Sequence, residues 1–423
     1  MAPTRYVIVG GSAAGMAAAQ AIRELDSHGA ITVLSAEADP PYFRPLIPFI
    51  VDGHKTAGEI AMLGQGPYTA PDIVVRLDAT VTSVDPVAHT VTVNDAEHIE
   101  YDRLLIATGS RPYIPPSIQG TDTPGVYTLR TLADARSMAE RANVTRNVIL
   151  AGGGMLNLKT AFALLERGLA VTMVVTSPEV LSQIMEPDGA ALIRDALDRA
   201  GLRILTGRSI TQVIAGPDGV TGVLLDSGEE LPCEIVCIGK GVRPNVEFLA
   251  GSGIHVDRGV VADKHTACNT ADVYTAGDVA VTFDPITGGR MMTALWTNAV
   301  EMGRCAGRNM AGRPTAYGGT FGILSATELG ILNATQVAEV PFVSMGIVHT
   351  AGADYETHVF RTADTYRKMV FTADGERLIG AVFVGDIARA GLYRHLIRDH
   401  ARLNDLKAVV VGHRLHYGHF LRF

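Results

Sequence analysis

The amino-acid sequence predicts an α/β protein with two doubly wound parallel sheets, followed by a C-terminal α+β domain. Two units of strand, glycine-rich turn and helix predict the sheets, and they begin at Arg5 and Asn147. A short apolar strand that runs through a tight turn into a helix is typical of parallel α/β folds. The composition agrees, because 47% of the residues are hydrophobic and only 19% are charged. Such a composition suits sheets that are buried on both faces.

The first unit predicts a site for the phosphates of a dinucleotide. Its apolar strand runs directly into a small-residue turn, and a helix is expected from Met16 to Leu25. The start of a helix offers free amide groups and a partial positive charge to a pyrophosphate. Gly10 allows the tight turn, and Gly15 lets the helix pack closely on the strand. Ser12 replaces a glycine of the usual pattern, but it is small. The expected phosphate loop comprises Gly10, Gly11, Ser12, Ala13, Ala14 and Gly15.

The segment after the first helix predicts contacts to the rest of a dinucleotide. A second strand, expected at 31–34, is followed by Ser35 and Glu37. A carboxylate beyond the second strand is placed to hold ribose hydroxyls. Arg44 and Pro45 lie in a proline-rich loop at 40–49 and are expected against a planar ring or a diphosphate. Residues 72–94 then predict strands and turns.

Three later segments complete the pattern. A strand at 104–107 ends in Thr108-Gly109, and the segment 272–280 contains Gly277 and Asp278. The second glycine unit has Gly152 and Gly154, followed by an expected helix at 155–167 and a strand at 170–175. Because two such units reinforce each other, they indicate two nucleotide sites.

These segments together resemble the pyridine nucleotide-disulfide oxidoreductase family, flavoproteins that hold FAD and a nicotinamide nucleotide in paired Rossmann domains. The resemblance is closest to NADH:rubredoxin reductases, ferredoxin reductases and the flavin domains of nitrite reductases. It implies an FAD domain in two parts, 1–113 and 243–314, with an NAD(P) domain inserted at 114–242. Residues 315–423 are then expected to form an α+β domain for dimerisation or partner contact.

The resemblance also implies which residues bind each cofactor. It adds no catalytic acid or base and no metal ligand. Around FAD it implies the loop Gly10, Gly11, Ser12, Ala13, Ala14 and Gly15, with Ser35, Glu37, Arg44, Pro45, Val81, Ala107, Thr108, Gly109, Arg130, Gly277, Asp278, Leu295 and Trp296. For NAD(H) or NADP(H) it implies Gly152, Gly154, Met155 and Lys159. Packing in the core is the alternative for Trp296.

The cysteines differ from those of many relatives, which carry a redox disulfide or a reactive cysteine in the segment that matches 41–49. This chain has no cysteine there. Cys233 and Cys237 flank a short strand, and residues four apart on a strand are ~13 Å apart, too far for a disulfide. We expect both to be ordinary thiols. Electrons should therefore leave directly from the flavin, which disfavours disulfide-reductase and peroxidase chemistry.

The second glycine unit also departs from the family pattern. Asn157 replaces the third glycine, which predicts looser packing of helix on strand. Lys159 stands where relatives often carry a glutamate, and Phe49 stands where ferredoxin reductases carry a lysine. Lys159 is then either a cation near the flavin or a solvated helix lysine. Val175 leaves neither a carboxylate nor an arginine for the ribose, so the choice between NAD and NADP stays open, as does loss of the site.

The C-terminal segment from Arg389 to Phe423 is locally basic, with seven Lys or Arg against two Asp or Glu. His413, His416 and His419 are spaced by three, which is compatible with a metal site only on a regular helix. Gly412 and Gly418 argue against such a helix. The alternatives are docking onto an acidic partner and a plain solvated end.

The sequence therefore predicts an FAD-dependent oxidoreductase that passes electrons between NAD(P)(H) and a protein partner. The partner is either a one-electron carrier such as an iron–sulfur protein, or the iron–sulfur or metal-containing sister subunits of an aldehyde or 2-oxoacid oxidoreductase. The alternative is a non-catalytic FAD-binding subunit with a degraded nicotinamide site. A homodimer and a hetero-complex both remain open.

The net charge, the length of the apolar runs and the cysteine content limit the possible partners and the cellular compartment. The net charge of −8 disfavours nucleic acid as a partner. No apolar run approaches the ~20 residues that a membrane span needs. Four scattered cysteines and the absence of a targeting signal predict a cytoplasmic protein.

Overall fold

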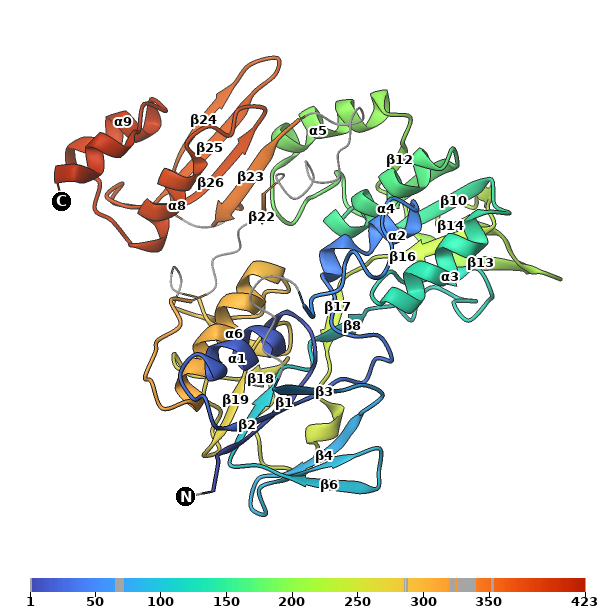
Figure 1. Ribbon diagram of the computed structural model, residues 1–423. Coiled ribbons are helices and arrows are strands. Elements are labelled where there is room, and N and C mark those ends of the chain that lie inside the picture. Colours follow the sequence, from blue (N-terminus) through green and yellow to red (C-terminus); the bar gives the residue numbers. More distant parts are fainter. Residues whose placement is uncertain are drawn as a thin grey trace. The chain divides into compact units, whose positions relative to one another are not determined.

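The structure is a computed structural model, and it describes residues 2–64, 72–284, 286, 288–319, 324–325, 340–350 and 354–422. The chain forms two compact units (Figure 1). The first unit comprises Met1–Tyr113, Arg130–Ala135 and Val242–Thr320. The second comprises Ile114–Leu129, Arg136–Gly241 and Phe321–Phe423. The second nucleotide-binding fold is thus inserted in the sequence of the first.

A parallel sheet of order β19-β7-β1-β2-β3 forms the centre of the first unit. Its central strand β1 contributes Tyr6 to Val9, all at most 4% exposed, because helices and strands cover both faces. The strands are β1 (Arg5–Val9), β2 (Ala30–Leu34), β3 (Ile73–Arg76), β7 (Arg103–Ile106) and β19 (Val273–Thr275). The carboxyl ends of all five strands meet at one edge, where ligands of such sheets bind.

Helices α1 (Ala13–Arg23) and α6 (Trp296–Met310) lie side by side in the first unit (Figure 1). Their close approach requires small residues. A Cβ on Gly303 would lie 2.2 Å from the Ala14 carbonyl oxygen, and one on Gly307 would lie 2.5 Å from that of Ala18. This packing fixes the start of α6 next to the phosphate loop.

Shorter elements complete the first unit. An antiparallel sheet of β4, β5 and β6 packs over its core, and β8 pairs with β17. These elements and the remaining ones are β4 (Val81–Asp85), β5 (Thr90–Val93), β6 (Glu97–Glu100), β8 (Ser110–Pro112), β17 (Val242–Pro244), β18 (Val260–Val261), β20 (Ala280–Phe283), β21 (Arg290–Met291) and α2 (Pro48–Val51).

The second unit contains another parallel sheet, of order β12-β11-β10-β16-β9. A three-stranded antiparallel sheet of β13, β14 and β15 accompanies it, and α3 (Leu132–Ala142) connects the two units in the sequence. The elements are β9 (Val126–Tyr127), β10 (Asn147–Ala151), α4 (Met155–Glu166), β11 (Ala170–Val175), α5 (Pro187–Arg199), β12 (Arg203–Thr206), β13 (Ile210–Gly216), β14 (Gly219–Leu225), β15 (Glu230–Pro232) and β16 (Ile235–Ile238).

In its described residues, the C-terminal part of the second unit is an antiparallel sheet with the helices α8 and α9. The sheet order is β22-β23-β26-β25-β24, and every residue of the central strand β26 is buried. The elements are β22 (Leu324–Ser325), β23 (Phe342–Gly346), β24 (Glu356–Arg361), β25 (Tyr366–Phe371), β26 (Leu378–Val384), α8 (Ala390–Arg398) and α9 (Lys407–Val411). Tyr366 and Lys368 of β25 both bind Glu186, which immediately precedes α5.

The predicted fold class, two doubly wound domains with a C-terminal α+β domain, is confirmed. Two helix predictions differ at their ends. The first helix begins at Ala13 because Met16 N already donates to Ser12 O at 2.9 Å, so the small residues of the loop belong to the helix. The sequence also predicts a helix at 388–402, but α8 begins at Ala390 and ends at Arg398, because His400 takes a positive φ of 50°. In the described residues no helix is long and apolar enough to cross a membrane.

Candidate functional site

The first phosphate loop has the close backbone contacts that its sequence predicts. Gly10 has a φ of +119°, and a Cβ there would lie 2.1 Å from the Ala107 carbonyl oxygen. A Cβ on Gly15 would lie 1.9 Å from the Gly10 carbonyl oxygen. Ser12 is the N-cap of α1 but makes no side-chain capping bond. The amide groups at the start of α1 are therefore available to a bound anion.

Glu37 and Arg44 are held together beyond the end of β2. The Glu37 carboxylate accepts hydrogen bonds from Tyr42 Oη and from Arg44 Nη2, both at 2.6 Å. Arg44 Nη1 also donates to Arg130 O at 2.6 Å. Each carboxylate oxygen keeps a lone pair, so the group is oriented and can still accept a ribose hydroxyl. Tyr42 did not emerge from the sequence, because a tyrosine in an aromatic loop carries no motif.

Asp278 lies where three segments of the first unit meet. Its carboxylate accepts from Ser110 Oγ at 3.0 Å and forms an ion pair with Arg130 Nη2 at 2.9 Å. Gly277, with a φ of +84°, brings the chain against α1, because a Cβ there would lie 3.0 Å from Ala14 Cβ. Ser110, Arg130 and Asp278, which are far apart in the sequence, therefore lie together at one edge of the sheet.

Thr108 is hydrogen-bonded to Asn245, a residue for which the sequence predicts no role. Thr108 Oγ1 donates to Asn245 O at 2.8 Å, and Asn245 Nδ2 donates back to Thr108 O at 2.9 Å. Gly109 accepts from Asn245 N at 3.0 Å. These bonds hold the turn after β7 in place. The segment Gly241-Val-Arg-Pro-Asn245 also resembles the family, but this resemblance gives Asn245 no role.

Trp296 begins α6, directly after its N-cap Leu295. Its ring lies 6.0 Å from that of Phe43 and is only partly buried, so it borders the core instead of filling it. Asn298, on the first turn of the helix, is 7% exposed, and its Nδ2 has no partner among the described residues. Val81, in β4, packs in the core of the unit at 8% exposure.

These residues fit a dinucleotide that carries a ring system. The loop after β1 leaves room only for backbone, Glu37 stands beyond β2, and the unpartnered Asn298 amide stands at the start of α6. A buried amide group without a partner is costly in the free protein, and a ligand carbonyl would satisfy it. The geometry thus agrees with FAD as the group that this site holds.

The second loop differs from the first in how its third position is filled. Asn157 is 1% exposed, and its Nδ2 donates to Ala151 O at 2.9 Å and to Gly152 O at 2.8 Å. Gly239 makes room for this side chain, since a Cβ on Gly239 would lie 2.2 Å from Asn157 Oδ1. The sequence predicted only looser packing. The structure adds that Asn157 ties the loop together through hydrogen bonds.

We expect Gly239→Ala to disrupt this loop and to weaken binding of the nicotinamide nucleotide by about tenfold or more, because Asn157 must move away from the Ala151 and Gly152 carbonyls. Asn157→Gly removes the clash, so the double variant Asn157→Gly/Gly239→Ala should bind more tightly than Gly239→Ala alone. Calorimetric titration with the nucleotide measures both. Equal affinities for the single and the double variant would contradict this account.

The other predicted nucleotide residues lie around the start of α4. Gly154 is its N-cap, and Met155 is its first residue. Lys159 is only 8% exposed, so its interpretation as a solvated helix lysine is wrong. Its alternative role, as a cation near the flavin, stays a prediction. Val175 ends β11 and is 2% exposed.

None of the four cysteines, which all lie in described residues, forms a disulfide, and Cys233 and Cys237 are both buried. Burial raises the pKa of Cys233 and of Cys268 to about 12, and that of Cys305 to about 11. These three thiols are therefore protonated at neutral pH, and a protonated thiol is a poor nucleophile.

The C-terminal histidines do not form a metal site. His413 Nδ1 lies 3.0 Å from Tyr393 Oη, and burial lowers its pKa. The rings of His416 and His419 instead lie against each other, with their centres 3.8 Å apart and their planes tilted by 44°. Among the described residues, the three do not bring their nitrogens together. The basic side chains Arg389, Arg398, Arg402 and Lys407 contact groups of the same domain.

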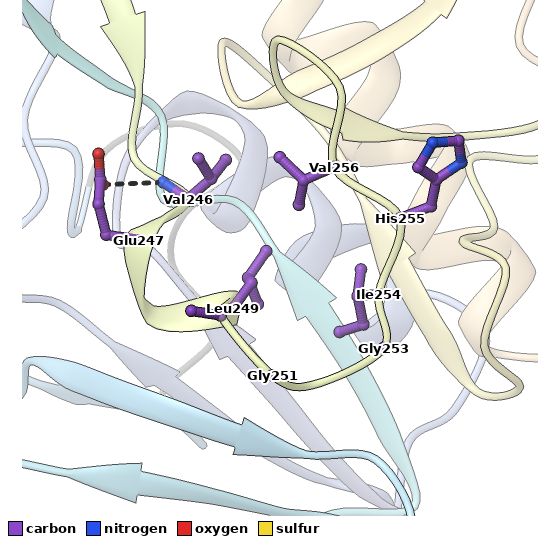
Figure 2. Close-up of a pocket in the computed structure, with 9 residues that line it drawn as sticks. Val246, Glu247, Leu249, Gly251, Gly253, Ile254, His255 and Val256 are labelled. Atoms are coloured by element: carbon purple, nitrogen blue, oxygen red, sulfur yellow. Dashed lines mark hydrogen bonds between the residues drawn. The ribbon is translucent and has the colours of Figure 1, made fainter.

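A hollow of about 470 Å³ lies in the first unit along residues 246–256. Figure 2 shows Val246, Leu249, Ile254 and Val256 around it, and the hydrogen bond from Val246 N to Glu247 Oε2 at 3.2 Å. The Glu247 carboxylate is paired with Arg111. The hollow includes none of the predicted FAD residues, and its lining is mainly aliphatic, so we assign it no function.

Comparison with known proteins shows to which family the chain belongs. The family model described as pyridine nucleotide-disulphide oxidoreductase matches residues 4–303, and the model of the rubredoxin NAD+ reductase C-terminal domain matches residues 332–401.

Individual relatives agree with these models. The chain is 28% identical to the epsilon subunit of NADH-dependent phenylglyoxylate dehydrogenase from Aromatoleum evansii, over 98% of this chain and 96% of the relative. It is 30% identical to an NADH oxidase from Methanocaldococcus jannaschii, over 73% of this chain and 70% of the relative. The solved NAD-dependent persulfide reductase from A. fulgidus has the same fold, with a TM-score of 0.87 at 24% identity over 95% of this chain and 78% of that one. The chain therefore belongs to the pyridine nucleotide-disulphide oxidoreductase family and is an FAD-dependent oxidoreductase that uses NAD(P)(H).

Proposed function

We propose that the chain is the FAD-carrying subunit of a multi-subunit oxidoreductase, in which it passes electrons between NAD(P)(H) and metal or iron–sulfur centres of sister subunits. The observation that carries this proposal is the match to the epsilon subunit of the phenylglyoxylate dehydrogenase, which extends over nearly the whole of both chains. Aldehydes and 2-oxoacids are the substrate classes that such a complex would oxidise. The setting would be the cytoplasm.

The chain's own residues bind and orient the cofactors. The loop at Gly10 receives the FAD pyrophosphate, Glu37 the ribose, and Asp278, fixed by Arg130 and Ser110, the ribityl chain. When bound, FAD accepts a hydride and releases electrons singly, which matches a nicotinamide donor to a one-electron acceptor. Gly152 and Gly154 open the loop that receives the nicotinamide nucleotide. No proton transfer by a side chain is needed for this exchange.

The buried thiols support an acceptor outside the chain. Residues 41–49 contain no cysteine, and the thiols of Cys233, Cys268 and Cys305 are kept protonated by burial. The chain therefore lacks the cysteines that would form the redox disulfide or reactive thiol of many relatives. Electrons pass instead from the flavin to a partner protein.

Purification from the native source without a tag tests the proposal. We expect the chain to co-elute with sister subunits that contain iron–sulfur clusters, and we expect anaerobic NAD(P)H to bleach the flavin of that complex. Adding the organic substrate to the oxidised complex should reduce the same flavin. A stable homodimer that bleaches with NAD(P)H but carries no other subunit would contradict the complex. A flavin that neither nucleotide bleaches would favour the non-catalytic alternative.

A stand-alone reductase of a small electron carrier is the second candidate. The match of residues 332–401 to the C-terminal domain of rubredoxin NAD+ reductase favours it. Rapid anaerobic reduction of rubredoxin or a ferredoxin by the isolated chain and NAD(P)H would support this candidate over the complex.

A further inference from the structure

The loop after β11 determines which nicotinamide nucleotide this fold accepts, because the adenosine ribose lies beyond the second strand of such a sheet. An NAD site places a carboxylate there for the 2′-hydroxyl, and an NADP site places a cation for the 2′-phosphate. In this chain β11 is followed by Thr176 and Ser177. Neither residue carries a charge, so the sequence leaves the selectivity open.

The structure brings a cation to this loop from elsewhere. Lys240 follows β16, which lies two strands away from β11 in the sheet. Its Nζ nevertheless reaches Thr176 Oγ1 at 2.6 Å. Thr176 Oγ1 also lies 3.1 Å from Ser209 Oγ. A lysine ammonium and two hydroxyl groups from three separate segments thus meet beyond the carboxyl end of β11.

The Lys240 ammonium carries a desolvation cost that a bound anion would offset. Burial lowers the pKa of Lys240, and no carboxylate lies within ion-pair distance of it in the described part of the chain. The exposed Arg208 follows β12, and its backbone N donates to Val175 O at 3.2 Å. An anion at this position would complete the coordination of the Lys240 ammonium.

Glu179, an acid in the loop that follows β11, is paired with an arginine. Glu179 Oε1 forms an ion pair with Arg194 Nη1 at 2.9 Å, and Glu179 Oε2 is buried out of reach of solvent. Glu179 therefore stands four residues beyond the end of β11, and Arg194 offsets its charge. No carboxylate directly follows β11, where an NAD site carries one, while an ammonium and two hydroxyls that could bind a phosphate lie there.

We infer that Lys240, with the hydroxyls of Thr176 and Ser209, binds the 2′-phosphate of NADP(H) and makes this nucleotide the preferred one. The inference rests on the proposed use of a nicotinamide nucleotide and specifies it. Lys240 acts as a specificity residue, because the phosphate that it binds is far from the reacting ring.

Calorimetric titration of the FAD-loaded chain with 2′,5′-ADP and 5′-AMP tests the inference without measuring turnover. These probes share the adenosine and differ in the 2′-phosphate. We expect 2′,5′-ADP to bind at least about tenfold more tightly than 5′-AMP, and we expect Lys240→Met to remove most of that difference. Lys240→Arg should keep it. Arg203→Met, on the amino end of β12, removes an equal charge away from the site and should change neither affinity.

The remaining outcomes would contradict the inference, and one of them would also contradict the proposed function. Equal affinity of the wild type for both probes would overturn the inference, as would tighter binding of NADH than of NADPH. A loss in Lys240→Met that is equal for both probes would overturn it too, because the ammonium would then contact another part of the nucleotide. If the chain binds neither NADPH nor NADH, the proposed function fails as well, whereas selection of NADH leaves that function intact.

Discussion

Gly10→Val should leave the protein nearly free of flavin. The added Cβ would lie 2.1 Å from the Ala107 carbonyl oxygen, far inside van der Waals contact, so β1 and β7 must separate at their carboxyl ends. The φ of +119° adds strain of about 1–2 kcal/mol or more for a residue with a Cβ. Because the loop amides then no longer converge on a pyrophosphate, we expect flavin content to fall below roughly a tenth of that of the wild type.

The measurement is the ratio of flavin to protein after purification with excess FAD. Gly53→Ala is the matched control, because Gly53 also has a positive φ, of 82°, but a Cβ there meets nothing within 4 Å. It carries the backbone strain without the clash and should retain flavin. Stoichiometric flavin in folded Gly10→Val would show that the FAD phosphates bind elsewhere.

The first phosphate loop was predictable because its requirements are local. A tight turn and a close approach of backbone to backbone demand small residues at fixed spacing, and Gly10 and Gly15 stand at that spacing. The carboxylate expected after the second strand depends on spacing in the same way. Both features lie within forty residues of each other in the sequence.

The features that the sequence did not reveal depend on residues far apart. Asn157 departs from the glycine pattern of the loop, and the sequence does not show why it fits. In the structure Gly239, which follows β16, leaves room for its side chain. The Lys240 ammonium reaches Thr176 although β10 lies between the strands β16 and β11 that precede these two residues. No rule of sequence spacing predicts this contact. The edge strand β24 was also missed, because its exposed residues lack a clear alternation of polar and apolar side chains. Tertiary contacts of this kind require the sheet order to be known.

A buried ion pair connects the C-terminal sheet to the nucleotide-binding fold within the second unit. Lys368 of β25 has only 3% of its side chain exposed, and it pairs with Glu186, of which 31% is exposed. Lys368 Nζ also donates to Val348 O at 2.9 Å, and Tyr366 Oη donates to Glu186 Oε2 at 3.1 Å. Ser344 of β23 donates to the carbonyl of Ile184. The carboxylate is partly exposed to water, whereas the ammonium is buried.

This asymmetry predicts unequal effects of removing the two partners. Glu186→Leu leaves the Lys368 ammonium buried without its counter-charge and should destabilise the second unit by about 3–5 kcal/mol. Lys368→Met removes the buried charge itself and leaves a carboxylate that reaches water, so the loss should be about 1 kcal/mol or less. The double variant Glu186→Leu/Lys368→Met should recover most of the loss of Glu186→Leu, because neither charge is then left alone.

Hydrogen exchange of the amides in β23, β25 and β26 measures the stability of the second unit directly. The fluorescence of Trp296, the only tryptophan of the chain, reports on the first unit and serves as the internal control. We expect Glu186→Leu to speed exchange in these strands while the Trp296 signal stays unchanged. Equal destabilisation by both single variants would contradict the asymmetry. A double variant as unstable as Glu186→Leu would show that α5 depends on the Glu186 carboxylate at its start instead of on the pair.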